Sequence, residues 1–163
     1  MNESNAYRLN VGLIIVNDFG KVLLCRRQNT NRWQFPQGGI DGKEKPVNAA
    51  KREMFEEVGI KPKSVKLIGK TTNWVEYKVP REKIKLHFKK KGIIGQRQKW
   101  FMFKLKEDVD ISFDNDPDNE FDSYSWVSYW HPLSKIVSFK RHVYQRVLHE
   151  LLHNYNNEFL NDN

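Results

Sequence analysis

Short runs of apolar residues separated by turn residues dominate the first forty positions of the chain. Residues 10–17 (NVGLIIVN) are followed by DFG, a turn signal, and then by residues 21–27 (KVLLCRR), so this region predicts a β-hairpin. Residues 32–39 (RWQFPQGG) alternate large apolar and polar side chains before a Gly-Gly pair. This alternation predicts a further strand that ends in a loop.

Two segments have helical periodicity. Residues 46–58 lie between Pro46 and Gly59, which are typical first and capping residues of a helix. A second amphipathic helix is expected over about residues 138–156. Residues 64–79, 99–106 and 122–130 read as further strands. Strands in the middle and two helices predict an α+β fold or an α/β/α layered fold, in one domain of residues 1–163. The apolar positions of the two helices are Val47, Ala50, Met54 and Val58, and Val143, Val147, Leu151 and Tyr155.

Three carboxylates crowd the end of the first predicted helix, two in its last turn and Glu53 one turn earlier. Glu53, Glu56 and Glu57 are spaced i, i+3 and i+4, and we expect them opposite the apolar stripe and within mutual reach. The helix macrodipole disfavours each by about 0.3–1 kcal/mol there. A solvated acidic face is one interpretation. A bound Mg²⁺ or Mn²⁺ is the other, because a cation removes the repulsion and leaves ligand positions for phosphate and water. Arg52 is expected to pair with Glu56.

The charge distribution favours an anionic partner. The net charge is +8, the segment 78–99 is strongly basic, and the segment 108–122 is acidic. A basic chain attracts polyanions such as RNA or nucleotides. The alternative is a lysine-rich hairpin that is simply solvated.

Composition excludes several classes of protein. An apolar content of 39% argues against a disordered chain, and no apolar run approaches the ~18–20 residues of a membrane span. Cys25 is the only cysteine, so disulfide frameworks and cysteine-rich zinc sites are excluded. The first ten residues lack the layout of a signal peptide. We therefore expect a cytoplasmic protein with no membrane association, and the sequence names no protein partner.

Residues 149–153 (HELLH) match the H-E-x-x-H pattern of zinc proteases. Only ten residues follow His153, which leaves little chain for a third ligand, and a terminal helix rarely supplies an enclosed cleft. We interpret His149 and His153 as surface residues of an amphipathic helix.

Residues 38–60 resemble the Nudix box, G-x5-E-x7-R-E-U-x-E-E-x-G-U, at every defined position. The resemblance implies an α/β/α sandwich with a mixed central sheet and a loop-helix-loop at the box. It also implies a hydrolase that uses two or more Mg²⁺ or Mn²⁺ ions to cleave phosphoric anhydride bonds. Glu53, Glu56 and Glu57 would bind the ions, and Gly38, Glu44, Arg52 and Gly59 would support the site. The matching residues are Gly38, Glu44, Arg52, Glu53, Met54, Glu56, Glu57, Gly59 and Ile60.

Motifs outside the box resemble the RNA pyrophosphohydrolase branch of this family, whose relatives include dinucleoside polyphosphate hydrolases. These motifs are YRLNVG, WQFPQGGI, NW-x2-YK-x-P, GQRQKWF, EFDSYSWVSYW and VSFKRHVY, and they extend from Tyr7 to Tyr144. The resemblance implies that Glu120 completes the metal site or acts as base, although a solvated loop is the alternative for this acidic segment. Substrate contacts are implied for Arg8, Arg27, Gln37, Gly38, Val137, Phe139 and Lys140. Without the resemblance, Phe139 reads as a core aromatic.

The implied activity is conversion of 5′-triphosphate RNA to 5′-monophosphate RNA with release of pyrophosphate, which promotes mRNA decay. Glu53 or Glu120 would deprotonate the attacking water, and the sequence does not decide between them. Hydrolysis of diadenosine tetraphosphate-type substrates is the alternative, and a noncatalytic RNA-binding module is a third hypothesis. The complete carboxylate set argues against the third. Preferred metal, nucleotide preference and oligomeric state are not readable from the sequence.

Overall fold

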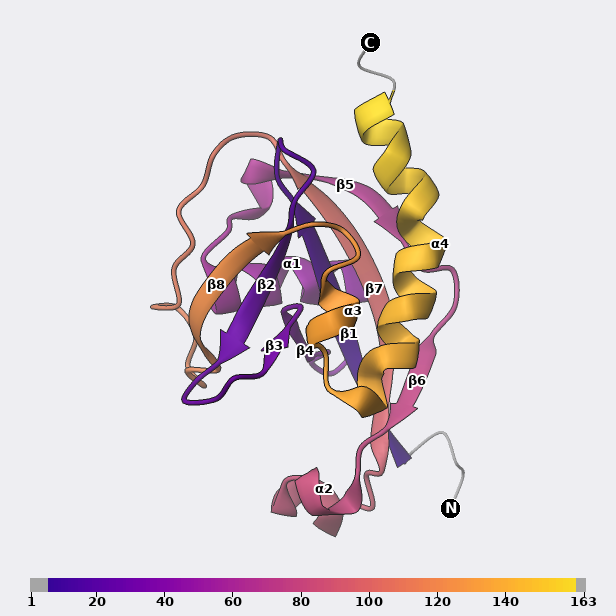
Figure 1. The fold of residues 1–163 in the computed structure, drawn as a ribbon. Helices are drawn as coiled ribbons and strands as arrows, with labels where there is room; N and C mark the ends of the chain where they lie inside the picture. Colours follow the sequence, from indigo (N-terminus) through magenta and orange to yellow (C-terminus); the bar gives the residue numbers. More distant parts are fainter. Residues whose placement is uncertain (1–5, 161–163) are drawn as a thin grey trace.

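A mixed sheet separates two helical layers in the computed structural model, which describes residues 6–160 (Figure 1). Helix α1 (Pro46–Val58) covers one face of the sheet, and helix α4 (Arg141–Leu160) covers the other. The expected α/β/α sandwich is confirmed. The strands are β1 (Tyr7–Val16), β2 (Val22–Arg27), β3 (Trp33–Gln34), β4 (Gln37–Gly39), β5 (Val65–Lys70), β6 (Val75–Lys78), β7 (Gly95–Leu105) and β8 (Phe121–Val127).

The centre of the sheet is the parallel pair of β1 and β7, which runs from Tyr7–Gly95 to Val16–Lys104. Strands β5 and β6 pair antiparallel with the other edge of β7, and β8 and β3 pair antiparallel with β2. Parallel strands need a crossover connection, which here contains α1, and burial on both faces, which α1 and α4 provide.

Alternating side chains of β1 explain the two cores. Val11, Leu13 and Ile15 belong to the buried cluster that includes the apolar residues of α1. Ile14 and Val16 point to the opposite face and join the cluster that includes α4. Because successive strand residues face opposite sides, a continuous apolar run is what a strand covered on both faces requires.

Helix α4 packs through the periodic positions of the sequence. Val143, Val147 and Leu151 are buried, and Tyr155 is partly buried. Tyr144, one position along, is also buried, and its hydroxyl accepts a hydrogen bond from the Phe35 N–H at 2.9 Å. The segment begins with a 3₁₀ turn, Ser138–Lys140, and the helix reaches Leu160, somewhat beyond the expected end.

Three expected elements differ from the structure. The single strand expected over residues 64–79 is two strands, because the backbone turns after Lys70. At this turn Thr71 forms hydrogen bonds with the backbone of Trp100. Residues 32–39 give only β3 and β4, since Pro36 has no N–H to continue a ladder. The basic segment 78–99 is no simple hairpin but contains a 3₁₀ turn (Arg81–Lys83) and α2 (Leu86–Lys90). A further short helix, α3 (Pro132–Lys135), precedes α4.

One end of the sheet opens to make room for a pocket. Strand β1 pairs with β2 only at Val16–Val22, near their shared turn, whereas its middle pairs with β4 from Asn10–Gly39 to Gly12–Gln37. Between these contacts the two strands diverge (Figure 1).

No helix within the described residues is long and apolar enough to cross a membrane.

Candidate active site

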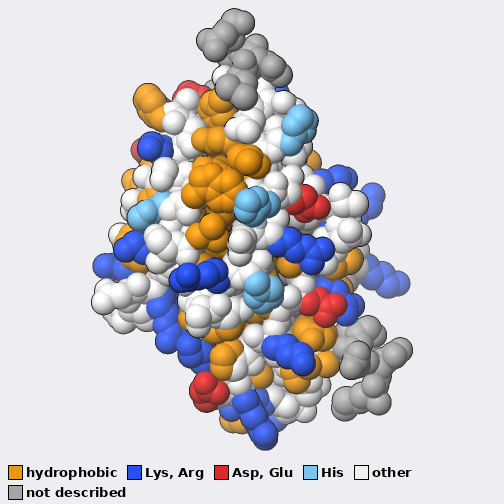
Figure 2. Space-filling model, turned by 45° about the vertical axis from the view of Figure 1, so that its right-hand side comes forward, with side chains coloured by type: hydrophobic (Ala, Val, Ile, Leu, Met, Phe, Trp, Pro, Cys, Tyr) orange, Lys and Arg blue, Asp and Glu red, His pale blue; other side chains and the backbone are white. Residues whose placement is uncertain are grey.

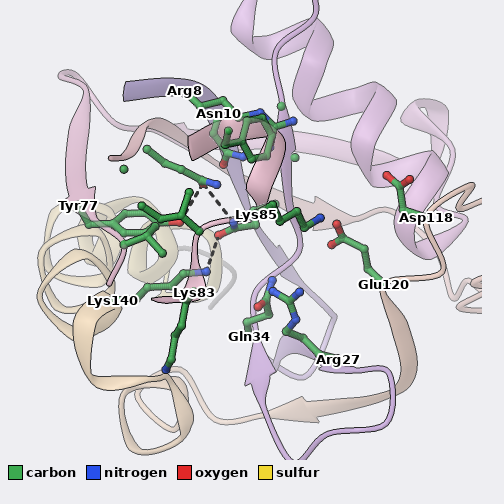
Figure 3. Close-up of a pocket in the computed structure, with 18 of the residues that line it drawn as sticks. Arg8, Asn10, Arg27, Gln34, Tyr77, Lys83, Lys85, Asp118, Glu120 and Lys140 are labelled. Carbon is green, nitrogen blue, oxygen red and sulfur yellow. Dashed lines mark hydrogen bonds between the residues drawn. The ribbon is translucent and has the colours of Figure 1, made fainter. Parts of the chain in front are cut away.

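A cavity of about 250 Å³ lies at the open end of the sheet. Its wall is formed by helix α1, strand β4, the loop before β8, the β6–β7 connection and the 3₁₀ turn before α4. Figure 3 shows Glu120 and Asp118 on one side of the cavity and Lys140 and Tyr77 on the other, with Lys85 and Arg27 between them. The acidic lining residues are Glu53, Glu56, Glu57, Asp116, Asp118 and Glu120, and the cationic ones are Arg8, Arg27, Arg32, Lys83, Lys85 and Lys140.

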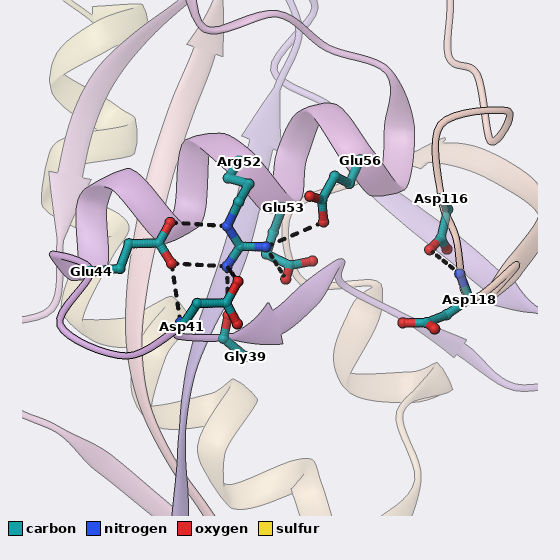
Figure 4. Close-up of polar contacts among 8 residues, drawn as sticks. All are labelled: Gly39, Asp41, Glu44, Arg52, Glu53, Glu56, Asp116 and Asp118. Atoms are coloured by element: carbon teal, nitrogen blue, oxygen red, sulfur yellow. Dashed lines mark hydrogen bonds and ion pairs between the residues drawn. The ribbon is translucent and has the colours of Figure 1, made fainter.

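Arg52 organises the acidic residues of the box (Figure 4). Its guanidinium donates to both oxygens of Glu44, at 2.9 and 3.0 Å, and through Nη1 to Glu53 at 2.9 Å and Glu56 at 3.2 Å. It also donates to the Gly39 carbonyl at 2.9 Å. Bidentate pairing with Glu44 fixes the planar group, so the remaining nitrogen, Nη1, holds the other two carboxylates at defined positions. The expected Arg52–Glu56 pair is present.

Gly38 is required by the position of Glu53. A Cβ at Gly38 would lie 2.0 Å from Cδ of Glu53 and 2.2 Å from its Oε2. Strand β4 therefore passes directly against this carboxylate. Burial raises the pKa of Glu53 to about 7, although the hydrogen bond from Arg52 opposes the rise.

Glu57 is buried, which corrects the expectation that all three glutamates lie opposite the apolar stripe. At 100° per residue, Glu57 lies only about 20° from Ala50, so it faces the same side as the apolar residues. Its exposed fraction is 3%, and its Oε2 atom has no hydrogen-bond partner among residues 6–160. Burial, and then the nearby charge of Glu120, raise the pKa of Glu57 well above its usual range.

The loop before β8 carries Glu120, the fourth carboxylate of the predicted metal site. Asp116 accepts hydrogen bonds at 2.9 Å from the backbone N–H groups of Asp118 and Glu120, one through each oxygen. The backbone of Glu120 in turn accepts a bond from the Gln28 N–H. These contacts present Glu120 to the cavity. Burial raises the pKa of Glu120, and the charge of Arg27 opposes this effect.

The carboxylates fit divalent cations. A buried oxygen without a partner and like-charged groups with raised pKa values are what a cation would compensate. Within residues 6–160, however, no three acidic, histidine or cysteine side chains already converge to hold one ion. Arg52 holds Glu53 and Glu56, and Mg²⁺ at phosphate sites commonly takes only one or two carboxylates. The arrangement therefore suits ions that bind together with a phosphate ligand.

The opposite wall combines a buried lysine with aromatic rings. Lys140 is only 7% exposed, and its Nζ lies 5.4 Å from the Tyr77 ring centroid and 3.4 Å from Oε1 of Gln37. Burial lowers the pKa of Lys140 to about 8, with the charge of Arg27 adding to the effect. Phe139 packs against the core and also lines the cavity, beneath the Lys83 ammonium at 5.2 Å.

Val137 does not line the cavity, unlike its two expected partners Phe139 and Lys140. It packs against the core cluster of α4, and its carbonyl accepts the Lys140 N–H in the 3₁₀ turn. Its side chain therefore supports this wall from the side of the core. Val137 is thus not brought to the cavity wall with Phe139 and Lys140, and its expected contact with substrate stays a prediction.

A chain of amide groups connects Gln37 to the interior. Gln98 is buried; its amide donates to Asn10 at 2.7 Å and to Oε1 of Gln37 at 3.3 Å, while its oxygen accepts from Trp100. Gln37 donates to Gln96 at 3.3 Å. The side chain of Gln37 is thus held at the cavity wall, beside Gly38.

Arg8 and Arg27 both reach the cavity, as expected. Arg8 lies against Gly39, where a Cβ would meet its guanidinium at 2.2 Å, and its Cζ lies 4.9 Å from the Phe88 centroid. Arg27 follows an irregularity in the β2–β8 ladder. Bulges next to sites commonly redirect a side chain, and here the irregularity accompanies the turn of Arg27 toward Glu120.

Several lining residues were not identified from the sequence. Asp116 gave no signal beyond an acidic segment, because its role depends on two backbone contacts. Arg32, Lys83 and Lys85 are brought to the cavity by loops. Tyr77 lies within a motif quoted above, NW-x2-YK-x-P, so the resemblance contained the only available signal.

The HELLH histidines lie on the exposed side of α4, as expected. His149 packs beside Trp130, with ring centroids 4.9 Å apart, and His153 contacts Asn157. Figure 2 shows histidine side chains separated from one another on this surface, beside a strip of hydrophobic side chains.

Comparisons with known proteins agree with this geometry. The NUDIX domain model matches residues 6–147. The chain is 45% identical over 153 residues to an RNA pyrophosphohydrolase of Marinomonas sp. (strain MWYL1), covering 93% of this chain and 94% of that protein. An RNA pyrophosphohydrolase of Proteus mirabilis (strain HI4320) is 46% identical over 92% of this chain and 85% of its own length.

Two solved structures share the fold at lower sequence identity. The E. coli dihydroneopterin triphosphate pyrophosphohydrolase superposes with a TM-score of 0.67 at 22% identity, covering 89% of this chain and 99% of that chain. A C. elegans Ap4A hydrolase binary complex gives a TM-score of 0.65 at 19% identity, covering 90% of this chain and 98% of that chain.

Proposed function

The chain belongs to the Nudix family, and we propose that it is an RNA 5′ pyrophosphohydrolase, converting 5′-triphosphate RNA to 5′-monophosphate RNA and pyrophosphate. One observation carries this proposal: a cavity with a carboxylate wall facing a cationic and aromatic wall, in a chain about 45% identical to RNA pyrophosphohydrolases along almost its whole length. The acidic side suits metal-assisted phosphate chemistry, and the other side suits an RNA 5′ end.

Glu53, Glu56, Glu57 and Glu120 would hold the cations, for which we propose two or more Mg²⁺ or Mn²⁺ ions. Such ions, when bound, neutralise charge on the phosphate oxygens and increase the acidity of water. The carboxylate oxygens match the preference of these hard cations. Glu57 supports the proposal most strongly, since its Oε2 is buried without a partner.

The cationic wall would bind and orient the triphosphate. Arg8 and Arg27 extend into the cavity from β1 and β2, where their guanidinium groups can pair with phosphate oxygens. Gln37, beside Gly38 on β4, offers a further amide contact. Phe139 presents a ring to stack a base, and Lys140 adds a positive charge at the same wall.

In the reaction, water attacks the α-phosphorus, the bond from that phosphorus to the bridging oxygen of the β-phosphate breaks, and pyrophosphate leaves. Glu53 and Glu120 both face the cavity, and burial raises the pKa of each, so both remain candidates for accepting the proton from water. Arg52 would keep Glu53 in place throughout.

Hydrolysis of dinucleoside polyphosphates is the competing activity, because it uses the same bond chemistry. The likeness to an Ap4A hydrolase extends to the fold alone, whereas the chain is 45% identical to an RNA pyrophosphohydrolase over 153 residues. A noncatalytic RNA-binding module is disfavoured by the complete set of carboxylates. An RNA substrate also fits the cytoplasm, where we expect the protein to act.

Incubation of the purified protein with triphosphorylated RNA and, separately, diadenosine tetraphosphate tests the proposal. With Mg²⁺ we expect 5′-monophosphate RNA and pyrophosphate, and no products in EDTA. The Glu56→Gln variant should lose most of this turnover, while Glu82→Gln, an exposed glutamate outside the cavity, should retain it. Turnover of diadenosine tetraphosphate alone would assign the competing activity, and turnover of neither substrate would exclude both.

A further inference from the structure

A second hollow, of about 570 Å³, adjoins the cavity and leads away from it. We call it the outer groove. One side is the β2–β3 turn, with Gln28, Thr30 and Arg32, and the other side is α2, with His87 and Phe88. The two hollows share Arg8, Arg27, Arg32, Lys85, Phe88, Asp118 and Glu120. A ligand that fills the cavity could therefore continue into the groove without crossing a ridge.

The groove differs from the cavity in its chemistry. The cavity has an apolar portion that includes Tyr77, Ile84 and Phe139, whereas Phe88 is the only apolar side chain among the groove residues. Its ring already faces Arg8. The two carboxylates of the groove, Asp118 and Glu120, lie at the border with the cavity. A charged surface with a single apolar side chain is suited to phosphate groups rather than to bases.

The cations of the groove are available for a ligand. The ion pairs formed within residues 6–160 involve neither Arg32 nor Lys85, and both side chains are exposed. By contrast, Arg26, on the same strand as Arg27, is paired with Asp122 at 2.9 Å. Unpaired cations on facing walls create a positive potential across the groove.

The β2–β3 side of the groove is fixed in place. Gln28 and Asn29 donate their backbone N–H groups to the Glu120 carbonyl at 2.8 Å and to Oδ2 of Asp122 at 3.0 Å. The Thr30 hydroxyl bonds the Arg27 carbonyl at 2.8 Å and accepts the Arg32 N–H at 3.0 Å. The turn that carries Arg32 is thus braced by the same loop that presents Glu120.

We propose that the outer groove binds the phosphodiester backbone of the nucleotides that follow the 5′ end, through Arg32 and Lys85, with His87 at the rim. This inference rests on the proposed function and extends it, since it defines the substrate as a chain rather than a mononucleotide. From the sequence, the basic β6–β7 connection was either a site for a polyanion or a solvated hairpin. In this proposal it supplies one wall of an RNA path.

Two matched double variants test the groove. Arg32→Gln/Lys85→Gln removes two groove cations, and Lys89→Gln/Lys91→Gln removes two lysines at the end of α2 that line neither hollow. The value of kcat/KM is measured with Mg²⁺ for a triphosphorylated dinucleotide and for a triphosphorylated single strand of about ten nucleotides. For the groove variant, the loss on the longer RNA should exceed that on the dinucleotide by on the order of tenfold. The control variant should lose similarly little on both.

Binding at several salt concentrations in EDTA gives a second readout that is independent of turnover. Each lost phosphate contact reduces the slope of log K against log salt by about 0.7, so the groove variant should lose about 1.4 for the longer RNA. Equal losses on both RNA lengths, or equal effects of the two double variants, would overturn the proposal. Failure of the proposed function would appear differently, as a wild-type protein that hydrolyses neither RNA, and the salt slopes would still test the groove.

Discussion

The positions of individual acidic residues in the cavity lower the folding stability of the metal-free protein. Glu57 has a buried oxygen without a partner, and its neighbours Glu53 and Glu120 carry the same charge. The folded state must either keep this charge buried or take up a proton, and both options cost free energy relative to the unfolded chain. A cation would remove that cost. Stability should therefore report on metal binding as directly as activity does.

The Glu57→Gln substitution tests this point. It removes the charge and keeps the shape, so the metal-free variant should melt at a higher temperature than metal-free wild type. Mg²⁺ should raise the melting temperature of wild type clearly and that of the variant much less. Hydrolysis should fall at least about 100-fold, since even outer-shell metal partners are worth 10–100-fold. Calorimetry with and without Mg²⁺ measures the shifts; an equal Mg²⁺ shift in both proteins would refute the assignment.

Lys140 predicts a pH dependence of substrate binding. Burial lowers its pKa to about 8, with Arg27 contributing and Glu120 opposing. The side chain loses its charge as pH rises through 8, so KM for triphosphorylated RNA should increase between pH 7 and 9. The Lys140→Arg variant stays charged and should show a flatter profile. An identical rise of KM in wild type and variant would show that another group is responsible.

The lowered pKa of Lys140 also affects folding: a higher pH, which weakens substrate binding, should favour the folded state. Between pH 8 and the usual lysine pKa of 10.5, the unfolded chain binds more protons at this residue than the folded protein does. The effect of Lys140 should therefore increase the free energy of unfolding as pH rises through this window.

At the scale of elements, local signals predicted α1 well. Pro46 begins the helix, and Gly59 ends it with a φ of 74° and an N–H that donates to the Phe55 carbonyl. These features act within a few residues, so the sequence alone reveals them. The predicted orientation of Glu57 was wrong because α1 is covered over most of its surface, by the sheet and beside the cavity, and only Asn48 of the helix is exposed. A helix buried over so wide an arc does not have one apolar side and one acidic side.

Strand β4 offers a sharp test of how elements position the site. A Cβ at Gly38 would overlap the Glu53 carboxylate, whereas a Cβ at Gly42 meets nothing within 4 Å. Gly38→Ala should fold but displace Glu53, so kcat should fall by about 10- to 100-fold. Gly42→Ala is the control: its φ of 52° costs about 1 kcal/mol of stability, and its activity should remain. Full activity in Gly38→Ala would mean that the position of Glu53 is unimportant.

At the scale of the whole molecule, the fold class and the box were predictable, and the assembly of the pocket was not. The box lies within residues 38–60, and its periodicity and spacing are local. Glu120, Lys140 and Lys85 come from three distant segments that meet only in the folded chain. The β6–β7 connection has no regular apolar period, so its placement over the cavity depends on contacts such as Phe88 with Arg8. Long-range packing of this kind leaves no pattern in one sequence.

A competition assay tests the central claim most directly. Triphosphorylated RNA and diadenosine tetraphosphate are mixed at equal concentration with enzyme and Mg²⁺, and the disappearance of both is followed in one reaction. The ratio of their rates equals the ratio of kcat/KM values. We predict that the RNA is consumed first, by at least about tenfold, and yields 5′-monophosphate ends and pyrophosphate. Preferential consumption of diadenosine tetraphosphate, with the RNA left intact, would contradict the account.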